Sequence, residues 1–192
     1  SGLKKDPAVE QFTVIYQISD MPVLFGEQEI AANAFSVDST FFKIFPYRVI
    51  AGSGRIVRSR DVVITRSFWK KKLGGKNAIG ATFKNTKGNK FTIIGVVDDP
   101  DTKTSWMPDI FMSDELDEFL FFDPIYAMLM APDTDIALLN KKYSKEHPRS
   151  KWSTYETVRY QYLPLKDLYY DKDHGKENKN YQYGNQSYVR VL

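Results

Sequence analysis

The chain has 192 residues, of which 42% are hydrophobic and 15% aromatic, so it can bury a core within one mid-sized domain or two small lobes. Its 27 Lys and Arg residues and 24 Asp and Glu residues are spread along the whole length, which argues against the concentrated basic stripe of a nucleic-acid-binding protein. Cysteine is absent, and this excludes disulfides, thiolate metal sites and a cysteine nucleophile. No apolar run in the sequence reaches the ~20 residues that cross a bilayer.

Alternating residues near the N-terminus predict a pair of strands. Residues 12–18 alternate with a period of two and are rich in aromatic and β-branched types, and residues 29–37 form a second extended segment. A turn is expected over 21–27, so the two strands would pair as a hairpin. Asp38 then favours the start of a short apolar helix that ends at Pro46.

The middle of the sequence is predicted to be rich in strands. Residues 61–65 indicate a brief buried strand, and the helix expected over 68–73 would end at Gly74. Residues 81–84 and 90–97 are typical of two strands joined by a polar turn.

The C-terminal part predicts a β-α-β unit followed by a polar segment. Residues 125–131 indicate a strand, and a helix is expected to start after Thr134 and run until Pro148. Residues 155–163 indicate a further strand. The composition of 171–187 is that of an exposed loop or linker, with hardly an aliphatic side chain.

Four short motifs occur in a fixed order along the sequence. They are V-D-x-x-F-F at 37–42, V-V-I-T at 62–65, I-G at 79–80 and I-I-G-V-V at 93–97. This order resembles the large extracytoplasmic domain of MacB-like and FtsX-like ABC-transporter permeases, and the resemblance covers most of the chain. One departure is the helix after Thr65, which is more aromatic and basic than is usual in that family.

The resemblance implies an α+β fold made of two lobes. Residues 1–45 and 110–192 would form a porter-like β-α-β lobe, into which residues 46–109 insert a strand-rich, sabre-like lobe. In that family the domain lies between the first two transmembrane helices, at the periplasmic face of the inner membrane. We therefore expect a hydrophobic span before Leu3 and another after Leu192 in the complete protein.

The resemblance also implies a mechanical role without catalysis. The domain would transmit conformational change from cytoplasmic ATP hydrolysis to a substrate or partner outside the membrane. Its expected partners are the transmembrane part of the permease, the ATPase, a second permease copy, and an extracytoplasmic adaptor or lipoprotein, with no cofactor and no nucleic acid. The isolated domain is expected to be a monomer. The alternative is a stand-alone module that binds a lipid or peptide in a cleft between the lobes.

Two groups of residues are candidate contact sites. The first, Trp106, Met107 and Pro108, would be either buried packing at a hinge between the lobes or, if exposed, a partner contact. The second is a basic and aromatic patch for an anionic surface, weighed against a helix whose aromatic residue packs inward; its members are Trp69, Lys70, Lys71 and Lys72.

The sequence shows no established catalytic or metal-binding pattern. Gly74-Gly75-Lys76 lacks the spacing of a phosphate-binding loop, and no serine lies in a nucleophile elbow. The two histidines do not form a zinc-binding pair. We interpret two acidic runs as a turn cluster and a solvated loop in place of cation sites; their members are Asp98, Asp99 and Asp101, and Asp171, Asp173, His174 and Glu177.

Overall fold

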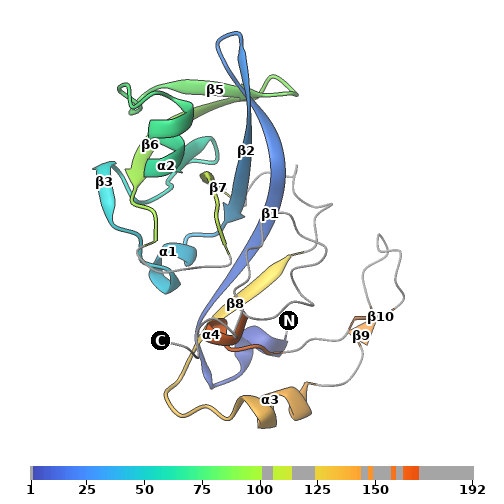
Figure 1. The fold of residues 1–192 in the computed structure, drawn as a ribbon. Helices are drawn as coiled ribbons and strands as arrows, with labels where there is room; N and C mark the ends of the chain where they lie inside the picture. The colour runs from blue at the N-terminus through green and yellow to red at the C-terminus, as the bar shows by residue number, and fades with distance from the viewer. Residues whose placement is uncertain are drawn as a thin grey trace, which may run out of the picture.

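The computed structural model describes residues 2–100, 106–113, 124–143, 147–148, 157–158 and 162–168 (Figure 1). Strands predominate over short helices, and the expected α+β class is confirmed. In chain order the elements are η1 (Gly2–Lys5), β1 (Val9–Phe25), β2 (Gln28–Val37), α1 (Phe41–Ile44), β3 (Val49–Gly52), β4 (Asp61–Thr65), α2 (Arg66–Lys72), β5 (Thr82–Asn85), β6 (Lys90–Val97), β7 (Ile110–Ser113), β8 (Ile125–Met130), α3 (Ile136–Lys142), β9 (His147–Pro148), β10 (Thr157–Val158) and α4 (Leu165–Leu168).

The main sheet closes on itself. β1 pairs antiparallel with β2, and β2 pairs parallel with β7. From β7 the pairing continues through β4, β6 and β5 and returns to β1. β3 joins the edge of β6, and β8 joins β1. The ring leaves few free strand edges, which are otherwise sites of unwanted pairing.

The strand β1 links the two ends of the molecule. Its first half, from Val9 to Ile15, pairs with β8, and its second half pairs with β2 as far as Phe25. With 17 residues it spans about 55 Å at roughly 3.3 Å per residue. In Figure 1 it runs from η1 and α3 at one end to β5 and β6 at the other.

The expected N-terminal hairpin is confirmed, but the turn is shorter than predicted. Residues 21–25 continue β1, and the chain turns only at Gly26 and Glu27. Pro22 pairs with Ala31 just after a register shift between Ile18 and Met21. Strands tolerate proline beside such irregularities, and this is why Pro22 did not end the strand.

The central strands are buried on both faces. In β4, Val62 and Ile64 belong to one buried cluster, whereas Val63 between them belongs to another. Alternate side chains of a strand point to opposite faces, so the continuous apolar run reflects a sheet covered twice. Phe68 of α2 packs in the first cluster and Phe41 of α1 in the second. The buried strand and the following helix expected here are confirmed.

Two strands were not anticipated from the sequence. β3 lies in a segment of mixed residues, and the four residues of β7 are all buried between β2 and β4. The strands of residues 46–109 share one sheet with β1, β2 and β7. The division into two lobes with these boundaries stays a prediction.

The C-terminal elements differ from expectation in extent. α3 ends at Lys142, so the helix expected to reach Pro148 is shorter and His147 lies in β9. The strand expected over 155–163 is described only as β10, which pairs with β9, and Tyr162 and Leu163 have no regular structure. The polar segment 171–187 lies outside the described residues.

A close backbone approach explains the glycine of the I-I-G-V-V motif. The N–H of Ser53 donates to the carbonyl of Ile94 at 2.8 Å, which brings the chain after β3 over β6. A Cβ added to Gly95 would lie 1.7 Å from the backbone oxygen of Ser53. Neither backbone can move without breaking the β3–β6 pairing.

Replacing Gly95 by Ala is therefore expected to lower the free energy of unfolding by about 3 kcal/mol or more. The control is Gly88→Ala: Gly88 has a positive φ of 80°, which strains an alanine, but a Cβ there meets nothing within 4 Å. That variant should lose only about 1 kcal/mol. Urea unfolding followed by tryptophan fluorescence measures both, and equal losses would contradict the account.

Candidate functional site

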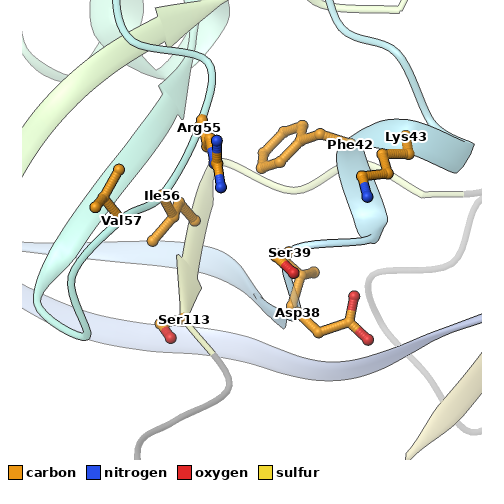
Figure 2. A pocket seen from close by; sticks show the side chains of 9 residues that line it. Asp38, Ser39, Phe42, Lys43, Arg55, Ile56, Val57 and Ser113 are labelled. Atoms are coloured by element: carbon orange, nitrogen blue, oxygen red, sulfur yellow. The ribbon is translucent and has the colours of Figure 1, made fainter.

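A pocket of about 590 Å³ lies where β2 and β7 end (Figure 2). One wall is the turn from β2 into α1, with Asp38, Phe42 and Lys43. The opposite wall is the loop between β3 and β4, with Arg55 and Ile56, while Ser113 of β7 lies at the base. Its walls thus come from three separate segments of the chain.

The carboxylate of Asp38 is used to build the pocket. It accepts hydrogen bonds from the hydroxyl of Thr13 at 2.8 Å and from the N–H of Val14 at 3.3 Å. It also accepts from the N–H groups of Thr40 and Phe41, at 2.8 and 3.2 Å. Asp38 thus binds N–H groups at the start of α1 as expected, but the N-cap position is Thr40, whose side chain makes no capping hydrogen bond. Both oxygens of Asp38 are occupied.

Two cations face the pocket from its opposite walls. Lys43 extends from α1, and Arg55 lies near Phe42 on the other side (Figure 2). Both side chains are exposed, and within the described part of the chain neither forms an ion pair. With respect to the described residues, these two positive charges are accessible to an anionic ligand.

The pocket has the chemistry of a binding site. Among the described residues its polar groups are the hydroxyls of Ser39 and Ser113, the two cations and the engaged carboxylate of Asp38. No histidine of that set lies beside either serine to activate its hydroxyl as a nucleophile. The arrangement can hold an anion beside apolar surface.

The acidic run that follows β6 is engaged in structural contacts. Asp98 forms ion pairs with Arg48 and, at 2.9 Å, with Arg66. Asp99 accepts from the N–H and the hydroxyl of Ser67, at 3.1 and 2.9 Å. Asp101 lies outside the described residues. No cluster of three or more metal-ligating side chains occurs among the residues that the structure describes.

The segment Trp106, Met107 and Pro108 is largely buried. The Trp106 ring is 7% exposed and packs against Phe45 and Phe35, with ring centroids 5.3 and 6.0 Å apart. Pro108 is also buried, so only Met107, at 42% exposure, reaches solvent. The structure does not present an exposed Trp–Met pair, and a contact role for this segment stays a prediction.

The helix α2 separates its aromatic residue from its basic ones. Trp69 is half-buried, packs against the first core cluster and donates from Nε1 to the carbonyl of Lys76 at 2.5 Å. Lys70, Lys71 and Lys72 are exposed. The lysines form the accessible surface and the tryptophan supports it, while binding by this patch stays a prediction.

An interaction that the sequence did not reveal holds the N-terminal segment against α3. Asp6 is only 6% exposed, and its Oδ2 accepts from Lys142 Nζ at 2.8 Å and from the Tyr143 hydroxyl at 2.5 Å. These two hydrogen bonds, followed by one from the N–H of Ala8, lower the pKa of Asp6 from 3.8 to about 2. Asp6 and Lys142 are separated by 136 positions in the sequence, so no local pattern could predict this contact.

Because the folded pKa of Asp6 lies below the unfolded value of 3.8, this contact stabilises the fold above pH 3.8 and is lost as the pH falls toward 2. The free energy of unfolding should therefore decline over that range. Asp6→Asn should weaken this dependence, and Tyr143→Phe should do so to a smaller degree. Chemical unfolding at several pH values measures the effect, and an unchanged slope in Asp6→Asn would contradict it.

Comparison with known proteins connects this fold to one family. Residues 3–142 match the family model described as the MacB-like periplasmic core domain. A comparison with curated proteins finds no match. None of the helices in the described part of the chain is long and apolar enough to cross a membrane.

Three solved structures share the fold. A domain of a putative permease from Porphyromonas gingivalis aligns with a TM-score of 0.62 and 17% identity, covering 74% of this chain and 72% of that one. The periplasmic region of MacB from Actinobacillus actinomycetemcomitans aligns at 0.59 and 18%, covering 74% and 68%. The extracellular domain of the noncanonic ABC-type transporter YknZ from Gram-positive bacteria aligns at 0.57 and 17%, covering 96% and 86%.

Proposed function

Because the chain belongs to the MacB-like periplasmic core domain family, we propose that it transmits movement from a membrane-embedded ABC-transporter permease to a partner or substrate outside the membrane. The shared fold with periplasmic and extracellular transporter domains supports this setting. ATP hydrolysis would take place in a separate cytoplasmic subunit or domain. The role we propose for this domain is mechanical and non-catalytic.

The observation that carries the proposal is the continuity of β1. At one end it pairs with β8, and η1 is tied to α3 through Asp6 and Lys142. At the other end it is part of the closed ring. Movement of the N-terminal end would therefore reach the distal strands through one hydrogen-bonded element, which suits rigid-body transmission.

The partners that we propose follow from the family to which the chain belongs. The transmembrane helices would hold the domain at the periplasmic face of the inner membrane, and the cytoplasmic ATPase would drive them. A second permease copy and an extracytoplasmic adaptor or lipoprotein complete the assembly that we propose. Trp106 packs between Phe35 and Phe45, which supports a role in stiffening the body.

One observation favours a second candidate, a domain that also binds a lipid or peptide. The pocket takes Asp38, Lys43 and Ser113 from the segments assigned to the porter-like lobe, and Arg55 and Ile56 from residues 46–109. It therefore lies where a cleft between the predicted lobes would lie. Its accessible cations and apolar side chains support ligand binding.

The transmission role is tested by making β1 flexible at one point, in the full-length permease together with its ATPase. A Gly-Ser-Gly insertion between Ser19 and Asp20, at the existing register shift, should leave ATP hydrolysis intact but uncouple the distal end. The measurement is energy transfer between a fluorophore on Lys87→Cys and labelled lipid in a nanodisc, with and without ATP.

The matched control carries the same insertion after Gly88, in the exposed turn between β5 and β6. It should keep the ATP-dependent change in energy transfer that the β1 insertion abolishes. If the β1 insertion also kept the full change, β1 would not be the transmitting element.

A further inference from the structure

We propose that the pocket formed by Asp38, Phe42, Lys43, Arg55, Ile56 and Ser113 binds an acidic peptide segment of an extracytoplasmic partner protein. Lys43 and Arg55 would hold a carboxylate of that segment, and the apolar wall would hold a neighbouring side chain. The inference deepens the proposed transmission role and rests on it for the identity of the partner as an extracytoplasmic protein.

The charge of the pocket favours an acidic ligand. The described residues of its lining carry two cations and one carboxylate, and that carboxylate already accepts four hydrogen bonds from the protein. Lys43 and Arg55 lie on opposite walls and have no ion-pair partner in the described residues (Figure 2). A carboxylate placed between them would accept charge-assisted hydrogen bonds from both sides.

The apolar wall favours a peptide over a free anion. Ile56 is half-buried and Val57 beside it is 74% exposed. Removing such aliphatic side chains from water is energetically favourable. Phe42 faces them across the pocket (Figure 2). A segment with an apolar residue next to an acidic one satisfies both the cations and this surface.

The shape of the pocket favours a peptide over a membrane. Its walls come from the β2–α1 turn, the β3–β4 loop and β7, and they enclose about 590 Å³. A side chain enters such a hollow, whereas the flat face of a bilayer contacts only its rim. Volumes of this order are typical of pockets that bind small ligands.

The test measures binding of a fluorescein-labelled peptide that alternates Glu with Leu and Phe to the purified chain by fluorescence anisotropy. Binding is expected at low salt and should weaken as salt is raised, because exposed charges are screened. The double variant Lys43→Glu/Arg55→Glu should weaken binding by about a hundredfold, since each charge-assisted contact is worth roughly tenfold.

The matched control is Lys84→Glu/Lys87→Glu, which makes the same change of charge at exposed positions of β5 and its turn. It should bind the peptide like the unaltered chain. A peptide with Lys in place of Glu should not bind, and vesicles of anionic phospholipid should not compete.

Three results would overturn the proposal. The first is an equal loss of peptide binding in both double variants, and the second is efficient competition by anionic vesicles. The third is that the unaltered chain does not bind the peptide while Lys43→Glu/Arg55→Glu has a lowered melting temperature. That result would mean that a segment of the chain itself occupies the pocket. Peptide binding by the purified chain is independent of the energy-transfer change in the full permease, so failure of the pocket and failure of transmission are distinguishable.

Discussion

The structure depends on the pairing of one long strand along most of its length. β1 pairs with β8 before Ile15 and with β2 and β5 after it, so the closed ring and the terminal elements share a backbone. Most paired residues of β1 have a neighbouring strand on one side, and Ile15, Val23 and Leu24 have one on each side. A hydrogen-bonded strand bends less readily than a loop, so β1 resists relative movement of the two ends. This constraint supports the transmission role that we propose.

Burial of the sheet on both faces makes it stiff and leaves accessible side chains mainly at the ends of its strands. Close-packed side chains cover β4 and β7 on each side, and the backbone of Ser53 lies against Gly95 without space for a side chain. Accessible chemistry is then found where strands end and loops begin. The pocket beside Lys43 and Arg55 is such a place, and the surface lysines of α2 are another.

Local patterns were sufficient to predict most elements, because alternation, capping residues and glycines act within a few positions. They predicted the hairpin, β4, α2 and β6, and the order of the motifs identified the family. They did not predict β7. Its four buried residues form a strand by pairing with β2 and β4, which are distant in the sequence. The pocket and the contact between Asp6 and Lys142 join segments that no local pattern connects.

The most direct test of the central claim is a distance measurement within the domain. Because the chain has no cysteine, spin labels can be placed at Lys5→Cys, near the start of β1, and at Lys87→Cys, in the turn after β5, provided that any cysteines elsewhere in the permease are replaced. Pulsed electron paramagnetic resonance on the full-length permease would compare this distance with and without ATP. A rigid transmitting body predicts the same distance distribution in both states, whereas an ATP-dependent change would contradict it.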